Sequence, residues 1–95
     1  MANLWTIAKA KKASASALAT SAKWGRAAAD AERYIKLLTR DRLTAPPQRL
    51  PQIDLELAVH RAVIEVATKA RRAAHRRYMV AQAILAANRL PGDES

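Results

Sequence analysis

The highest density of charged side chains in this 95-residue chain lies in one segment, Lys69–Arg77, with the sequence KARRAAHRR. The segment contains five Lys or Arg side chains and one histidine, and it has no carboxylate to neutralise them. An arginine guanidinium is planar and donates paired hydrogen bonds that match the oxygen atoms of a phosphate. The segment therefore predicts contact with an anionic polymer, and nucleic acid is the first candidate partner.

Charge is segregated along the rest of the chain as well. Residues 1–26 hold five bases and no acid, and residues 66–92 hold six bases and no acid. Residues 27–65 hold six bases and six acids, and the two acids that follow residue 92 bring the net charge of the chain to +9. If the chain folds back on itself, the two acid-free stretches meet and form one strongly positive end.

The sequence gives little support to catalytic chemistry. Glu56 and His60 are four residues apart and would share one face of a helix, but two ligands alone make a weak metal site. Ser14, Ser16 and Ser21 lack a nearby histidine–carboxylate pair that would activate a hydroxyl. A glycine-rich phosphate loop is also missing. We therefore expect a protein that is not an enzyme, with no catalytic residue, cofactor or metal.

Composition bounds the compartment and the partners. The chain has no cysteine, which fits a reducing compartment, and no apolar run of about 18 residues that would cross a membrane. The apolar residues of the first half are mostly alanine, which is too weakly hydrophobic for firm insertion into a membrane surface. We expect no membrane partner, and a cytoplasmic protein, or a virion-associated one if the chain comes from a phage.

Helix-forming residues dominate the chain on both sides of one proline-containing segment. Proline ends a helix because it lacks an N–H donor, and Ala, Leu, Lys and Arg are strong helix formers. The sequence predicts a single all-α domain, residues 1–95, made of a helix over about 3–44, a turn over 45–51, a second helix over about 52–90 and an acidic tail over 91–95. Gly25 weakens the first helix, and the alternative fold has three helices with a break there.

Each predicted helix has an apolar stripe at steps of three and four residues. The row of the second helix that we expect to face the first comprises Leu55, Val59, Ala62, Val66, Ala70, Ala73, Val80, Ile84 and Ala87. A second apolar row remains uncovered, so we expect the antiparallel hairpin to dimerise into a four-helix bundle or to join a larger assembly. The expected contact residues of that interface are Trp24, Ile53, Leu57, Ile64, Met79 and Leu85.

A short turn fixes the register of the two helices. With the turn centred near residue 48, residues whose numbers add to about 96 lie side by side. Lys23 and Arg26 then approach the segment Lys69–Arg77. Trp24 and Tyr78 both lie near the middle of the hairpin, and we interpret them as packing between the helices rather than as stacking platforms for bases.

Charge and topology together predict a non-catalytic protein that binds nucleic acid through its phosphates, largely independently of base sequence. The residues expected to make these contacts are Lys9, Lys12, Lys23, Arg26, Lys69, Arg71, Arg72, Arg76 and Arg77. The alternative is a protein–protein interaction module, such as a phage or plasmid structural subunit or an inhibitor. Such a module would dock its basic face onto an acidic partner or a larger assembly.

Overall fold

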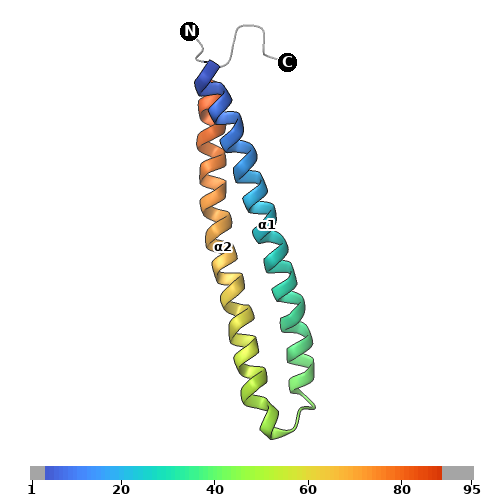
Figure 1. The fold of residues 1–95 in the computed structure, drawn as a ribbon. Helices are drawn as coiled ribbons and strands as arrows, with labels where there is room; N and C mark the ends of the chain where they lie inside the picture. The colour runs from blue at the N-terminus through green and yellow to red at the C-terminus, as the bar shows by residue number, and fades with distance from the viewer. Residues whose placement is uncertain (1–3, 89–95) are drawn as a thin grey trace.

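Two long antiparallel helices make up the computed structural model, which describes residues 4–88 (Figure 1). Helix α1 spans Leu4–Arg42 and helix α2 spans Leu50–Ala87, and a turn with a short 3₁₀ helix η1, Pro47–Arg49, joins them. The predicted all-α helical hairpin is confirmed. α1 continues through Gly25 without interruption, so the three-helix alternative is wrong.

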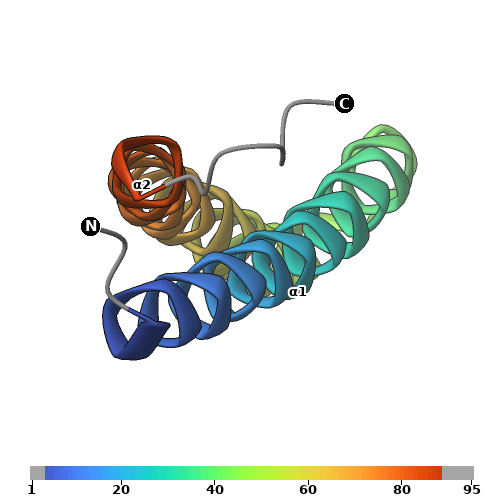
Figure 2. The same cartoon turned by 90° about the horizontal axis from the view of Figure 1, so that it is seen from above.

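The hairpin is long and thin. Its Cα atoms extend over 69 × 21 × 13 Å and its radius of gyration is 20.8 Å, whereas a compact domain of this length would have roughly 12 Å. Seen from above, α1 and α2 form one layer with no other helix against it (Figure 2). Within residues 4–88, each helix therefore packs along one side only and leaves the two broad faces of the layer open.

The helix ends follow from proline and from local hydrogen bonds. α1 ends at Arg42, two residues before the predicted boundary, with basic side chains in its last turn that suit the negative end of the helix dipole. α2 begins two residues earlier than predicted, with Pro51 in its first positions, where no N–H partner is needed. α2 ends at Ala87, and the Asn88 amide donates to the Ile84 carbonyl at 2.8 Å. The predicted end near residue 90 and the tail over 91–95 lie outside the described residues.

The seam between the helices has a seven-residue repeat, which is the pattern of a coiled coil. Its buried residues are Ala10, Ser14, Ala17 and Ala31 of α1 and Ile53, Leu57, Ala67, Ala74 and Ala81 of α2. Small side chains fill most of these positions, so the two backbones can approach closely. Ile53 is the one large side chain among residues 4–88 that is fully buried.

The assignment of the two apolar rows of α2 was wrong. Val59, Val66 and Val80, which we placed against α1, are 53%, 52% and 61% exposed. Ile53 and Leu57, which we placed in an outer interface, are instead buried against α1. The reason is the alanine-lined surface of α1, which packs closely only against a row that is itself small in the middle, at Ala67, Ala74 and Ala81.

The other residues of the predicted outer interface divide between the seam and the surface. Trp24, Ile64 and Leu85 are half-buried at seam positions of the seven-residue repeat, whereas Met79 is exposed. Tyr78 is also half-buried in the seam, so the interpretation of Trp24 and Tyr78 as interhelical residues agrees with their burial.

The predicted register is confirmed by contacts along the length of the hairpin. Near the open end, Gln82 Nε2 donates to Ser14 Oγ at 2.9 Å. Near the turn, Arg42 Nε donates to Asp54 Oδ1 at 2.7 Å. In both pairs the residue numbers add to 96, as the position of the turn requires.

Candidate nucleic-acid interface

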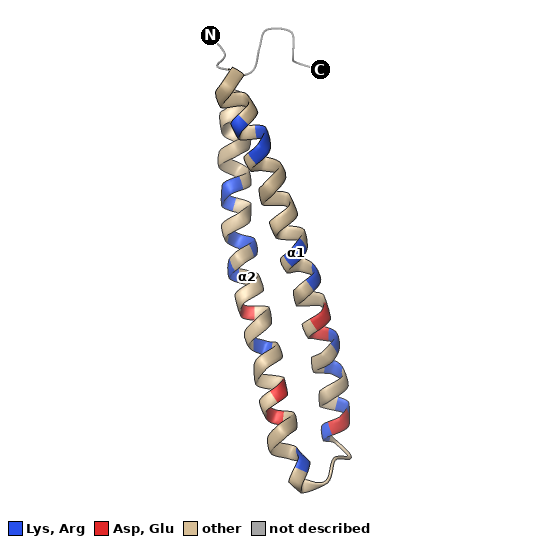
Figure 3. Cartoon of the chain, viewed as in Figure 1, with Lys and Arg blue, Asp and Glu red and all other residues tan. Residues whose placement is uncertain are grey.

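Within residues 4–88, the charged side chains in the half of the hairpin away from the turn are all basic. In Figure 3 the Lys and Arg segments of this half have no Asp or Glu segment among them, and the Asp and Glu segments of the described helices lie in the half nearer the turn. The acids among residues 4–88 lie between Asp30 and Glu65. Folding therefore brings residues 4–26 and 66–88 together into one positive end, which we call the basic end.

Ion pairing leaves this basic end almost unneutralised. The ion pairs within residues 4–88 are Arg33–Asp30 at 2.8 Å, Arg42–Asp54 at 2.7 Å and Lys69–Glu65 at 3.5 Å. Lys69 is thus the one predicted phosphate-binding residue with a carboxylate partner in this part of the chain, and that pair is long and exposed. The other eight predicted residues form no ion pair with a carboxylate of residues 4–88.

A basic groove lies beside the seam on α2. It has a volume of about 500 Å³ and is lined by Ser21, Thr68, Arg71, Arg72, His75 and Arg76. Its lining thus includes three arginines, one histidine and Ser21, and none of the lining residues is acidic. The Thr68 hydroxyl already donates to the Ile64 carbonyl at 2.9 Å. We call this hollow the arginine groove.

The side chain of Arg71, which lines the arginine groove, lies beside Gly25 of α1. A Cβ atom at Gly25 would lie 3.9 Å from both Cζ and Nε of Arg71, so this side chain crosses the seam against the bare α1 backbone. Lys23 and Arg26 flank Gly25 in sequence, and both are exposed. The crossing of Arg71 therefore brings the charge of α2 next to the charge of α1.

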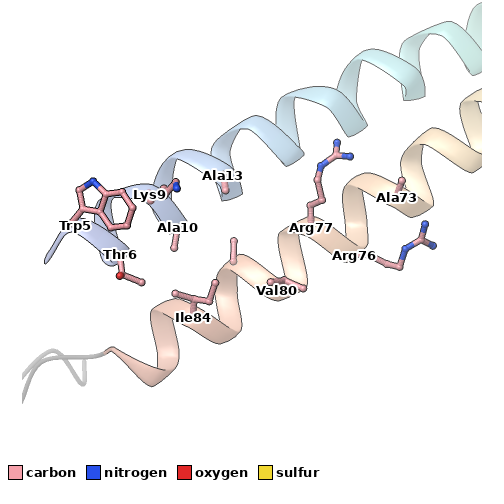
Figure 4. Close-up of a pocket in the computed structure, with 11 residues that line it drawn as sticks. Trp5, Thr6, Lys9, Ala10, Ala13, Ala73, Arg76, Arg77, Val80 and Ile84 are labelled. Carbon is pink, nitrogen blue, oxygen red and sulfur yellow. The ribbon is translucent and has the colours of Figure 1, made fainter. Parts of the chain in front are cut away.

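A second hollow lies between the N-terminal part of α1 and the C-terminal part of α2 (Figure 4). It has a volume of about 610 Å³, and its walls are largely alanine, Val80, Ile84 and the ring of Trp5. Among the predicted phosphate-binding residues, Lys9, Arg76 and Arg77 border it. The Lys9 ammonium group lies 4.6 Å from the centre of the Trp5 ring, a cation–π contact. We call this hollow the apolar groove.

The remaining predicted residues are less concentrated. Lys12, Lys23 and Arg26 are exposed on α1 and line neither groove. Sequence reasoning missed Ser21 as a member of the arginine groove. The register gives the signal that would have found it, because Ser21 and His75 have numbers that add to 96 and so lie side by side.

Comparisons with protein-family models, with curated proteins and with solved structures give no match to this chain. Within residues 4–88, no three His, Asp or Glu side chains are grouped so that they would hold a metal ion. Neither described helix combines the length and the apolar character that crossing a membrane requires. The charge of the basic end and the two grooves are therefore the features of the hairpin that bear on its function.

Proposed function

We propose that this protein is a non-catalytic nucleic-acid-binding hairpin that contacts phosphates with its basic end. The observation that carries the proposal is the absence of carboxylates from the described part of that end, where only Lys69 has an ion-pair partner. Concentrated positive charge of this kind repels itself in water, and a polyanion relieves the repulsion while releasing its own counterions.

The dimensions of the basic end suit a nucleic-acid backbone. Residues 66–88 of the basic end extend over roughly 33 Å of helix, at 1.5 Å per residue, which corresponds to about ten base pairs of duplex. Arginine dominates on α2, and its paired donors hold a phosphate more specifically than a lysine does. Arg71, Arg72 and Arg76 converge on the arginine groove, which supports a phosphate site there.

Base-specific contacts have no comparable support. The half-buried Trp24 and Tyr78 lie in the seam and are not free to stack on bases. Phosphate contacts fix the position of a protein on nucleic acid but carry no sequence information. Binding that is largely independent of base sequence is therefore part of the proposal.

A matched pair of triple variants tests this function. Neutralising the arginine groove with Arg71→Gln, Arg72→Gln and Arg76→Gln removes about 1 kcal/mol for each lost phosphate contact, which weakens duplex binding on the order of 100-fold. The control triple, Lys36→Gln, Arg40→Gln and Arg49→Gln, makes the same change in net charge near the turn. Fluorescence anisotropy with a labelled duplex measures both dissociation constants, and circular dichroism checks that both variants remain helical.

The control triple is expected to bind within a few-fold of the unaltered protein. Equal losses in the two triples would show that net charge alone governs binding, and would contradict a phosphate site at the basic end. Polyglutamate serves as a competitor because it presents carboxylates instead of phosphates. Displacement of the duplex by polyglutamate at an equal concentration of charges would favour an acidic protein as the partner and contradict the proposal.

A further inference from the structure

One broad face of the hairpin carries a row of exposed apolar side chains that includes Val59, Val66 and Val80, and the arginine groove lies on the other face, where Leu18 and Met79 are exposed. In α2, Val66 and Ala73 directly precede the buried residues Ala67 and Ala74, whereas Thr68 and His75 directly follow them. Residues on the two sides of a buried position point to opposite sides of the seam. The apolar groove contains Ala73, and the arginine groove contains Thr68 and His75, so the grooves open on opposite faces, and Arg76 is the one residue that borders both.

The seven-residue repeat extends the face of the apolar groove toward the turn. Steps of seven from the groove residue Val80 reach Ala73, Val66 and Val59, and in a coiled coil such positions keep the same orientation to the seam. The same steps from Ala13 of the apolar groove reach Tyr34 in α1. We call this surface, from the apolar groove to Val59 and Tyr34, the apolar face.

The two ends of the apolar face have complementary shapes. At the basic end it is hollowed by the apolar groove of about 610 Å³. Toward the turn it carries Leu37 and Val59, each about half exposed, and the half-exposed Tyr34, whose ring stacks on that of His60 with 5.1 Å between the ring centres. Hollow and projecting side chains thus lie on one face at opposite ends of the same hairpin.

The charges of the apolar face are complementary as well. At the basic end the face carries Lys9 and Arg77, which border the apolar groove. Steps of seven from Ala13 and from Arg77 reach Asp41 and Glu56 near the turn. Neither Asp41 nor Glu56 takes part in an ion pair within residues 4–88.

We propose that the occupant of the apolar face is a second copy of this chain, bound antiparallel to the first to form a four-helix bundle. A two-fold axis that crosses the hairpin near Gly25 and Arg71 relates the two ends of the face. Lys9 and Asp41 lie sixteen residues on either side of Gly25, so Lys9 of one copy meets Asp41 of the other. Val80 and Val63 lie at nearly equal distances from Arg71, so the apolar groove receives apolar side chains of the second copy.

The opposite orientation is disfavoured by charge. The basic end contains five bases from residues 4–26 and five from residues 66–88, and a parallel pair would stack two such ends on each other. The antiparallel pair separates them to the two ends of the bundle. Each broad face measures 69 by 21 Å, roughly 1,400 Å², which exceeds the roughly 800 Å² per partner of a standard stable interface.

The dimer has a consequence for the basic surface. Because the arginine groove opens on the other broad face, it stays accessible in the bundle. An antiparallel dimer then presents two arginine grooves near opposite ends of a rod about as long as the 69 Å hairpin. Lys9 and Arg77 would lie in the dimer interface, so the arginine groove, rather than these two residues, would contact phosphates in the dimer. Self-association is measured without nucleic acid, so its test is separate from that of the proposed function.

Light scattering coupled to size-exclusion chromatography tests the dimer with the full-length chain. The expected mass is twice the 10.4 kDa of one chain. Val80→Glu places a carboxylate in the apolar groove and is expected to give the monomer mass. Met79→Glu changes the neighbouring residue, which is similarly exposed but lies on the other side of the helix, and is expected to leave the dimer intact.

A monomer mass for the unaltered chain, or dissociation by Met79→Glu but not by Val80→Glu, would overturn the inference. The orientation has its own test, because the chain has no cysteine and accepts a single spin label at Gln48→Cys in the turn. In the antiparallel dimer the two labels are separated by a distance comparable to the 69 Å hairpin length. Two labels close together would show a parallel dimer and contradict the proposal.

Discussion

At the scale of single residues, the two halves of the hairpin differ in the ion pairing of their arginines. Arg42 and Arg33 in the turn half each form an ion pair with an aspartate, at 2.7 and 2.8 Å. Arg71, Arg72 and Arg76 converge on one groove without a carboxylate. Arginines near the turn therefore pair with carboxylates of the hairpin itself. Those of the arginine groove have no acidic residue beside them in the groove lining.

Gly25 gives a prediction at this scale. Gly25→Ala is expected to raise the free energy of unfolding by about 1 kcal/mol, because alanine is the better helix former. The added Cβ would meet only the Arg71 side chain, at an ordinary contact distance of 3.9 Å. Urea denaturation followed by circular dichroism measures the change. Ala19→Gly, at an exposed position of the same helix, is the reverse control and is expected to lose a similar amount.

A loss of stability in Gly25→Ala would contradict this view of Gly25. It would mean that the close crossing of Arg71 over α1 requires the bare backbone. The helical position of Gly25 is also where sequence reasoning left two folds open. Propensity alone counts against glycine in a helix, and only the continuous seam on both sides of Gly25 decides for an unbroken α1.

At the scale of elements, the Arg42–Asp54 pair ties the end of α1 to the start of α2. Arg42 donates from Nε at 2.7 Å and from Nη2 at 3.3 Å, so the aspartate is held by two hydrogen bonds. These hydrogen bonds lower the pKa of Asp54 below its ordinary value of 3.8. The pair lies next to the turn, where it helps to fix the register of the hairpin.

The lowered pKa predicts how this contact depends on pH. A carboxyl group with a lowered pKa in the folded state stabilises the fold above pH 3.8, and the contribution is lost as the pH falls through the lowered value. Asp54→Asn is therefore expected to be less stable than the unaltered chain at neutral pH. The difference is expected to shrink below pH 3.8. Urea denaturation of both proteins over this range measures it, and a difference that does not change with pH would contradict the role of the ion pair.

The two helices could be predicted from the sequence, but the face on which α2 packs against α1 could not. Prolines and charges near residue 48 sufficed to predict two helices, their ends at the turn to within two residues, and their register. The second helix, however, offers two apolar rows, and the row that includes Val59, Val66 and Val80 was the wrong choice. Burial by area favours Val59, Val66 and Val80, whereas close packing against an alanine-lined α1 favours Ala67, Ala74 and Ala81. Which of these two effects is larger depends on the surface of α1. The sequence pattern of the second helix alone does not contain that information.

At the scale of the whole molecule, the thin shape leaves one broad apolar face uncovered, and the charge distribution leaves the basic end without carboxylates in its described part. A layer of two helices, 13 Å thick, buries mostly alanine and leaves an apolar face uncovered. A second copy would cover that face, and the arginine groove would remain open on the other side. The basic end and the arginine groove could be predicted in outline, since the chain concentrates its acids between Asp30 and Glu65 and the turn brings the acid-free stretches together.

The most direct test of the proposed function is the salt dependence of duplex binding by the unaltered protein. The dissociation constant is measured from about 50 to about 400 mM salt. If about six of the nine predicted residues pair with phosphates, the logarithm of the association constant falls against that of the salt concentration with a slope of about −5. Sequence-unrelated duplexes are expected to give the same slope and similar affinities. Absence of binding at the lowest salt, or an affinity that does not change with salt, would contradict phosphate binding by the basic end.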